Sequence, residues 1–303
     1  MNKQFVKSTL TLRGKRKGQE WIDKISKLVK TYEDKWKIKV NEPFPELSIN
    51  YVAPALTSEG KPAVIKIGFP GDEEFLSEME TLKIYDGNGA VRILKIDEKD
   101  CVMLLERCVP GKPLTSLNDE EKEVFIFARV CKKIWKKPPV NSSFKNLSSE
   151  SKYFEWYFKN REKHQQYLPE KMVIKAVNFF DDLIKTQGEL YLLHSDLHQD
   201  NILSSERGYL AIDPKGIIGE REYESSVYIL NPYKRFKENE ELINKEFFAK
   251  RIELITEALD LNKERVTAWS FIKQILALIW SLQDYGIRDK ISIRNARELE
   301  KLL

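Results

Sequence analysis

The chain has 303 residues, with 51 Lys and Arg against 47 Asp and Glu, and a formal net charge of +4. Charges of both signs are spread along it, so the composition favours neither a nucleic-acid-binding protein nor a membrane-surface protein. The N-terminus is too polar for a signal peptide, no apolar run reaches membrane-spanning length, and the three cysteines lack metal-ligand spacing. We therefore expect a cytoplasmic protein with neither nucleic acid nor membrane as a partner.

The N-terminal third is predicted to form helices and antiparallel strands. Apolar residues at helical spacing predict an amphipathic helix over 18–32, preceded by basic residues that we interpret as a solvated tail. Alternating patterns then predict strands on either side of a turn at 58–61 and a second hairpin over 90–105. Between them, apolar residues at helical spacing predict a helix over 72–85. Lys66 stands in an otherwise apolar run, where a charge is costly unless it is paired. It is either a functional lysine or an edge-strand lysine that opposes aggregation.

After residue 107 the pattern becomes mainly helical, and the length fits either one large domain or two lobes. Asn118 is the expected cap of the first helix in this part, and Pro138-Pro139 is its stop. The segment between Asp213 and the last helices is short, which leaves little room for the activation segment of a protein kinase. The helices that we expect cover residues 119–136, 153–167, 169–188, 247–259 and 264–284.

The most informative stretch is 190–216, where an apolar strand runs into a polar loop and a second strand ends at Asp213. Asn201 follows Asp196 by five positions, and Asp213 follows Asn201 by twelve. Phosphoryl transfer needs a carboxylate that accepts a hydroxyl proton and hard oxygen ligands for Mg²⁺, and this spacing matches the catalytic loop of kinases. The alternative is a surface turn, because Asp and Asn favour turns in any case.

The segments HSDLHQDN (194–201) and AIDPKG (211–216) resemble the aminoglycoside phosphotransferases. Together with GFPGDEEF, YDGNGAVRIL and LLERCVPG they are most similar to the branch of streptomycin 6-phosphotransferase and hydroxyurea phosphotransferase. The resemblance implies an α+β, two-lobed protein-kinase-like fold, with an antiparallel β-sheet in an N-terminal nucleotide-binding lobe of residues 1–107 and a mainly helical C-terminal catalytic and substrate-binding lobe of residues 108–303. It implies ATP and Mg²⁺ as cofactors, Asp196 as the catalytic base, and Asn201 and Asp213 as metal ligands.

The resemblance also assigns the nucleotide contacts. Lys66 is expected to bind the α- and β-phosphates and to pair with Glu78, with Glu74 and Glu80 as fallback partners. The backbone of Glu106 and Cys108 is expected to pair with the adenine edge. No glycine-rich phosphate loop precedes Lys66, and the turn at 48–51 takes its place in this interpretation.

The substrate is expected to be a small hydroxylated molecule, with an aminoglycoside such as streptomycin favoured by the resemblance. An aminoglycoside carries several positive charges, so its pocket needs carboxylates, and Trp280 with Tyr285 are candidates for stacking. One alternative is a kinase of another metabolite, such as an amino alcohol, a sugar or hydroxyurea. A second is a nucleotide-binding regulator without turnover. The candidate substrate carboxylates are Glu220, Glu222 and Asp284, and also Glu224, which is alternatively a residue that caps or braces the fold.

Overall fold

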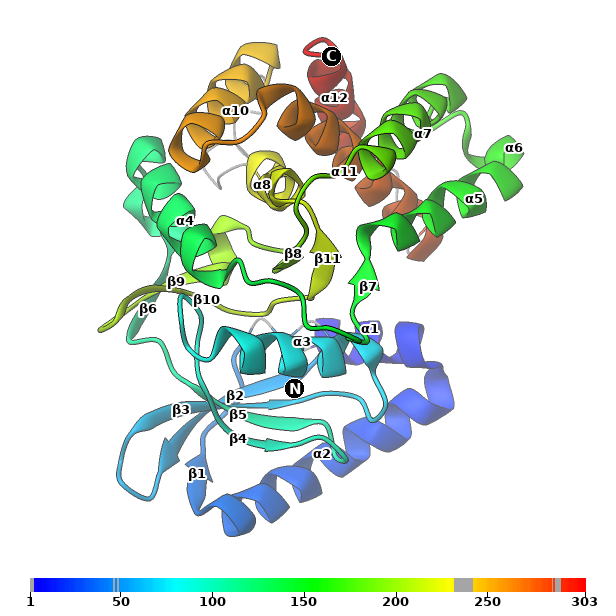
Figure 1. Cartoon of the computed structure of the whole chain (residues 1–303). Coiled ribbons are helices and arrows are strands. Elements are labelled where there is room, and N and C mark those ends of the chain that lie inside the picture. The colour runs from blue at the N-terminus through cyan, green and yellow to red at the C-terminus, as the bar shows by residue number, and fades with distance from the viewer. Residues whose placement is uncertain (1–2, 46, 48, 232–241, 285, 287–289) are drawn as a thin grey trace. The chain divides into compact units, whose positions relative to one another are not determined.

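The computed structural model describes residues 3–45, 47, 49–231, 242–284, 286 and 290–303. Internal contacts divide the chain into two units, residues 1–111 with 204–210, and residues 112–203 with 211–303. The first unit is built on an antiparallel sheet and the second is mainly helical (Figure 1), so the predicted α+β class is confirmed. Among the described residues no helix combines the length and the hydrophobicity needed to cross a membrane.

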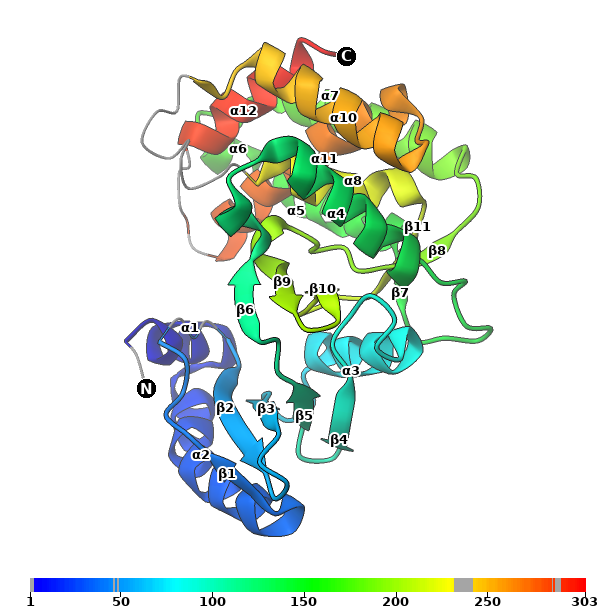
Figure 2. The ribbon, with the colours of Figure 1, turned by 90° about the vertical axis from the view of Figure 1, so that its left-hand side faces the viewer.

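The first unit contains a five-stranded sheet in which neighbouring strands are antiparallel. The strand order is β1-β2-β3-β5-β4. Helix α2 and helix α3 lie on opposite sides of this sheet (Figures 1 and 2). The elements are α1 (Lys3–Arg13), α2 (Lys15–Trp36), β1 (Ile38–Val40), β2 (Tyr51–Thr57), β3 (Pro62–Ile67), α3 (Glu73–Tyr85), β4 (Ile93–Asp97) and β5 (Val102–Glu106).

The packing of α2 determines which way the side chains of β3 point. Trp21 and Ile25 of α2 share one buried cluster with Ile65 and Ile67 of β3. Because successive side chains of a strand point to opposite faces of the sheet, Lys66 points to the other face. That face is the one covered by α3 (Figure 2).

The basic residues 13–17 belong to helices and not to a tail, although Lys15, Arg16 and Lys17 are exposed as expected. Residues 3–13 form helix α1, and Gly14 with φ 78° makes the left-handed turn into α2. Arg13 forms an ion pair with Asp72, the N-cap residue of α3, and its guanidinium lies 5.1 Å from the centroid of the Phe69 ring. The basic residue thus finds a specific partner in the fold, which its position in a charged run does not reveal.

In the second unit α11 contacts five other helices, α5, α7, α8, α10 and α12 (Figures 1 and 2). A small sheet has the strand order β7-β11-β8. Strands β6 (Pro110–Pro113), β9 (Ile202–Ser205) and β10 (Gly208–Ala211) run through the boundaries between the two units. The other elements are η1 (Leu114–Leu117), α4 (Glu120–Ile134), β7 (Lys145–Asn146), η2 (Leu147–Glu150), α5 (Ser151–Lys159), α6 (Arg161–His164), α7 (Glu170–Lys185), β8 (Tyr191–Leu193), η3 (Gln199–Asn201), β11 (Ile217–Gly219), α8 (Arg221–Leu230), α10 (Lys245–Leu259), α11 (Lys263–Asp284) and α12 (Lys290–Glu300).

Several features of this unit differ from expectation. The helix expected over 153–167 is divided into α5 and α6, and α12 follows the last helix that was expected. The cap of α4 is Asp119, whose side chain accepts a hydrogen bond from the N–H of Lys122 (3.2 Å), whereas Asn118 takes a left-handed conformation at the end of η1. Helix α8 occupies the short segment after Asp213, where no helix was expected. This helix matters because it reaches the loop that carries Asp196.

Candidate active site

The loop at 194–201 is held between strands of the second unit. Strand β8, which leads into the loop, pairs antiparallel with β11. The segment after β10 is hydrogen-bonded to both ends of the loop: the N–H of Ile212 donates to the carbonyl of Asn201, and the N–H of Lys215 donates to the carbonyl of His194, both at 2.9 Å. These two bonds place Asp213 beside the loop that carries Asp196 and Asn201.

The backbone of Asp196 is fixed while its carboxylate stays available. Its carbonyl accepts hydrogen bonds from the side-chain amide of Asn201 and from the N–H of His198, both at 2.9 Å. The carboxylate makes no hydrogen bond to any residue in the described part of the chain, and the side chain is partly exposed. A hydroxyl group of a ligand can therefore reach it, which is the requirement for a general base.

The residues expected to bind a metal fit a magnesium ion. The carbonyl of Asp196 can only accept, so it fixes the orientation of the Asn201 amide and leaves the Oδ1 atom on the other side. Asp213 is exposed and has a left-handed φ of 59°. No group of three His, Cys, Asp or Glu side chains suited to a metal occurs among the described residues. Two oxygen ligands suit Mg²⁺, because it usually binds one or two carboxylates together with waters and phosphate oxygens.

His194 holds the loop and remains neutral. Its Nε2 lies 2.8 Å from the carbonyl oxygen of Ile212, so Nε2 carries the proton and donates. Its Nδ1 then accepts from the N–H of Asp196 at 3.3 Å. Burial lowers the pKa of His194 to about 4, because the charged imidazolium would lose its hydration. A neutral imidazole with both nitrogens engaged positions Asp196 and does not transfer protons.

Glu224 anchors the same loop from α8. Its Oε2 accepts the N–H of His194 at 2.7 Å and its Oε1 accepts the N–H of Ser195 at 2.9 Å. Ser195 has a φ of 60°, an uncommon conformation that these two bonds stabilise. The side chain is fully buried, and burial raises its pKa to about 7 although the two N–H donors and Lys273 act in the opposite direction. Of the two roles expected for Glu224, a substrate contact or a brace of the fold, these hydrogen bonds agree with the brace.

We expect replacement of Glu224 by glutamine to lower kcat and to remove a pH dependence. The folded protein binds a proton at Glu224 more tightly than the unfolded chain, because its pKa is about 7 and not 4.5. The contribution of Glu224 to stability therefore falls as the pH rises from 4.5 to about 7. A protonated carboxyl also keeps only one good acceptor oxygen for the two N–H groups, so kcat should fall below pH 7.

The two effects are measured as differences between wild type and Glu224→Gln. Urea unfolding between pH 4.5 and 8 should show the wild type losing stability relative to the variant as the pH rises. The kcat of the variant should be low and flat over the same range, while its KM for ATP stays within about twofold of wild type. Identical pH profiles of the two proteins would contradict the assigned role.

Lys66 and Glu78 form the predicted pair in the first unit. The Nζ atom lies 2.7 Å from Oε1 and 2.8 Å from Oε2 of Glu78. The two residues are only 3% and 5% exposed. Of the fallback partners, Glu80 pairs with Lys83 instead. A buried ion pair adds little to stability compared with apolar residues of similar volume, so its presence favours a functional reason.

The segment expected to contact adenine leaves β5 at Glu106. The N–H of Glu106 donates to the carbonyl of Arg92 at 2.9 Å, and its carboxylate pairs with Arg207. The N–H of Cys108 makes no hydrogen bond within the described residues. Gly111 has a φ of 72°, and a Cβ there would lie 2.8 Å from the carbonyl oxygen of Cys108. Only glycine tolerates this close approach to the carbonyl of Cys108. The N–H of Cys108 stays open to a ligand.

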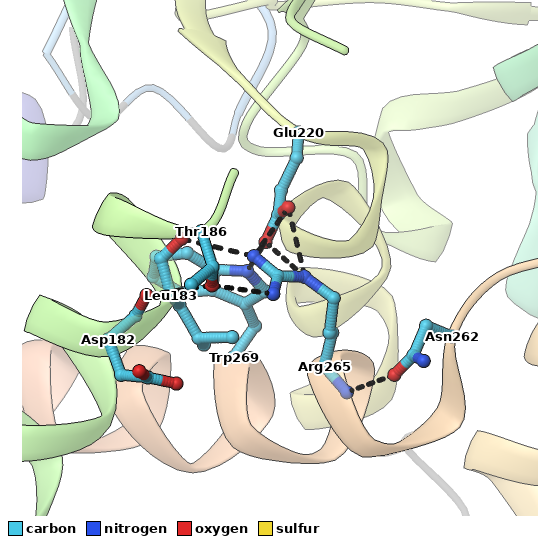
Figure 3. A network of polar contacts seen from close by, with 7 residues as sticks. All are labelled: Asp182, Leu183, Thr186, Glu220, Asn262, Arg265 and Trp269. Carbon is cyan, nitrogen blue, oxygen red and sulfur yellow. Dashed lines mark hydrogen bonds and ion pairs between the residues drawn. The ribbon is translucent and has the colours of Figure 1, made fainter. Parts of the chain in front are cut away.

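The structure argues against Glu220 as a substrate contact. Its side chain is 3% exposed, and both oxygens accept hydrogen bonds from Arg265 at 2.7–3.1 Å (Figure 3). The indole N–H of Trp269 donates to the same carboxylate. Glu220 is therefore neutralised inside the protein and links α8 to α11. The isolated sequence does not show this, because Arg265 follows 45 positions later.

The other substrate candidates have different positions. Glu222 lies in the first turn of α8, half-buried, with no ion pair among the described residues. Asp284 is the last residue of α11, and its side chain lies outside the described part of the chain, as does Tyr285. In the turn at 48–51, Ser48 lies outside the described residues too.

Residues 35–285 match the family described as aminoglycoside/hydroxyurea antibiotic resistance kinases. The chain belongs to this family. It is therefore a small-molecule kinase, which sets aside the alternative of a nucleotide-binding regulator without turnover.

Individual relatives agree with this membership. Streptomycin 6-kinase from Streptomyces griseus is 24% identical over 273 residues, which cover 89% of this chain and 87% of the relative. Hydroxyurea phosphotransferase from Kitasatospora aureofaciens is 24% identical over 270 residues, covering 88% and 76%. The solved structure of an amicoumacin kinase in complex with AMP-PNP, Ca²⁺ and Ami has a TM-score of 0.57 at 14% identity, covering 94% of this chain and 95% of that chain. The predicted protein-kinase-like fold is thus confirmed.

Proposed function

We propose that this kinase transfers a phosphoryl group from ATP, with Mg²⁺, to a hydroxyl group of a small molecule. The observation that carries the proposal is the carboxylate of Asp196, which has no hydrogen bond within the described residues although its backbone is fixed by Asn201 and His198. The relative solved with AMP-PNP and Ca²⁺ supports the choice of a nucleoside triphosphate and a divalent metal. The reducing cytoplasm is the proposed location, since the three cysteines are all free.

Each residue of the site has a distinct part in this proposal. Asp196 orients the acceptor hydroxyl and takes its proton, and Asn201 and Asp213 hold Mg²⁺. Lys66, kept in place by Glu78, neutralises the α- and β-phosphates, and the backbone of Glu106 and Cys108 pairs with adenine. Bound ATP would supply the phosphoryl group, and the magnesium ion would shield the negative charge of the phosphates. A preorganised arrangement of this kind lowers the barrier by positioning and electrostatics.

The relatives suggest two kinds of acceptor, a cationic aminoglycoside such as streptomycin and the neutral molecule hydroxyurea. An aminoglycoside would give the protein a role in antibiotic resistance. Glu220 forms an internal ion pair with Arg265 and is therefore not available to a substrate, which weakens the case for a polycationic acceptor. Glu222 remains the candidate carboxylate whose side chain is described.

The test is mass spectrometry of streptomycin and hydroxyurea after incubation with the protein and Mg·ATP. A gain of one phosphoryl group by either compound, absent with Asp196→Asn, would support the proposal. Incubation of a wider panel of aminoglycosides, sugars and amino alcohols without any phosphorylated product would contradict it.

Substitutions at the metal ligands are expected to weaken magnesium-dependent nucleotide binding unequally. Asp213→Ala removes a charged oxygen ligand, whereas Asn201→Ala removes a neutral one and also the hydrogen bond to the Asp196 carbonyl. We therefore expect Asp213→Ala to shift the Mg²⁺ concentration for half-maximal ATP binding by the larger factor, about tenfold or more. Calorimetric ATP titrations at several Mg²⁺ concentrations measure this shift. Two variants with the wild-type Mg²⁺ dependence would rule out the metal roles.

A further inference from the structure

Lys273 of α11 is a charged residue in the second unit that the proposed mechanism does not use. Its Nζ atom lies 2.8 Å from the hydroxyl of Tyr223, 4.9 Å from the centroid of the Tyr223 ring and 4.7 Å from that of Trp280. Tyr223 directly precedes Glu224, whose carboxylate holds the catalytic loop. Lys273 is therefore connected through one residue to the loop that carries Asp196.

The hydrogen bonds of this lysine are incomplete. An ammonium group has three donors, and only the hydroxyl of Tyr223 accepts from it within the described residues. The indole N–H of Trp280, next to it, is buried and has no partner in the same part of the chain. Unsatisfied buried donors are costly. The buried indole N–H of Trp280 lacks an acceptor and the partly exposed ammonium of Lys273 keeps further donors, which indicates that an oxygen-bearing ligand completes them.

Three carboxylates act on the charge of Lys273, and one of them belongs to the proposed base. The carboxylates that interact electrostatically with Lys273 are those of Glu150, Asp196 and Glu224. Burial nevertheless lowers its pKa, because desolvation outweighs these three attractions. Glu224 is fully buried, whereas Glu150 and Asp196 are partly exposed, and Asp196 is the proposed base.

Resting on the proposed function, we propose that Lys273 is an acceptor-binding residue that selects a neutral hydroxylated acceptor. Its ammonium donates to a carbonyl or hydroxyl oxygen of the acceptor while the reacting hydroxyl faces Asp196. The aromatic faces of Tyr223 and Trp280 that would otherwise attract a cation are already occupied by this ammonium. A guanidinium or ammonium group of an acceptor placed against these two rings would meet the like charge of Lys273. Trp280 therefore serves Lys273, and not a cationic substrate.

The experiment compares hydroxyurea, which is neutral, with streptomycin, which carries guanidinium groups. Steady-state kinetics are measured for wild type, Lys273→Met, Lys273→Arg and, as a matched control, Lys263→Met, an exposed lysine of the same helix. Lys273→Met should raise KM for hydroxyurea about ten- to a hundredfold, the range of a charge-assisted hydrogen bond. It should leave KM for ATP unchanged and improve kcat/KM for streptomycin relative to hydroxyurea. Lys273→Arg should retain most of the discrimination between hydroxyurea and streptomycin. Lys263→Met should have the KM and kcat values of wild type.

Three outcomes would overturn the inference. The first is an unchanged KM for both acceptors in Lys273→Met. The second is a preference of the wild type for streptomycin that this substitution lowers. The third is a loss of acceptor-independent ATP hydrolysis in Lys273→Met that equals its loss of transfer to the acceptor. Such a loss would place the ammonium on the transferred phosphoryl group.

A failure of the proposed function itself is distinguishable. If wild type phosphorylates neither compound, calorimetric binding of hydroxyurea to wild type and to Lys273→Met still tests the site. Binding by wild type that is lost in Lys273→Met supports the inference without turnover, whereas no binding, or equal binding by the two proteins, contradicts it. Circular dichroism melting of each variant identifies a folding defect. If Lys273→Met has such a defect, the comparison with wild type is made with Lys273→Arg and Tyr223→Phe instead. The second of these removes the hydrogen bond to the ammonium.

Discussion

Replacing Asp196 by asparagine is expected to abolish phosphoryl transfer while ATP still binds. The carboxylate is proposed to accept the proton of the attacking hydroxyl, and a carboxamide of the same shape cannot accept it. Loss of a general base costs on the order of 10²–10⁴ in rate. The backbone bonds of Asp196 to Asn201 and His198 involve its carbonyl, so the loop should keep its structure in the variant. The measurements are kcat with the acceptor that the mass-spectrometry test identifies and the Kd for Mg·ATP.

Asp200 offers a matched control in the same loop. Its carboxylate accepts a hydrogen bond from the hydroxyl of Thr115 at 3.0 Å, which an asparagine side chain also accepts. Asp200→Asn should therefore keep kcat close to the wild-type value. Asp196 is not the base if Asp196→Asn keeps near wild-type kcat. The same conclusion follows if kcat falls as far in Asp200→Asn as in Asp196→Asn.

The second large effect is expected at the buried pair in the first unit. Lys66→Met removes the ammonium that pairs with the buried carboxylate of Glu78, and breaking a buried ion pair from one side costs about 3–5 kcal/mol of stability. The double variant Lys66→Met/Glu78→Leu removes both charges from an apolar environment and should recover most of that loss. Both variants should nevertheless lack phosphoryl transfer, because neither retains the cation proposed for the phosphates. Urea unfolding followed by tryptophan fluorescence, together with the transfer assay, separates stability from function.

Lys83 supplies the control for this comparison. It pairs with Glu80 and Glu98 in a more exposed setting, where an ion pair contributes at most about 1 kcal/mol. Lys83→Met should change both stability and activity little. An active double variant at Lys66 and Glu78 would mean that the pair is structural, and the proposed phosphate contact would have to be abandoned.

The features predicted well from the sequence depend on short-range patterns. The spacing of Asp196, Asn201 and Asp213 is contained in one strand-loop-strand segment, so it could be identified directly. The pairing of Lys66 with Glu78 also involves neighbouring elements, because the alternation of β3 turns Lys66 toward the helix that follows it.

The features that were missed depend on residues far apart in the chain. Arg207 binds the carboxylate of Glu106 and the carbonyl oxygens of Gly87 and Ala90, which adds 204–210 to the first unit. Glu106 and Arg207 are 101 positions apart, and no local pattern joins them. The same reason explains the error at Glu220, whose partner Arg265 belongs to another helix. A free carboxylate and a paired one have the same sequence signature.

Helix α2 has a consequence for how fragments of this protein behave. The family match begins at residue 35, near the end of α2, yet this helix supplies Trp21 and Ile25 to the buried cluster against β3. A fragment trimmed to the family boundaries would uncover the apolar face of the sheet, including Ile65 and Ile67. Uncovered apolar surface of a sheet promotes aggregation. The smallest well-behaved fragment that contains this sheet therefore has to extend N-terminal to the family match and include α2.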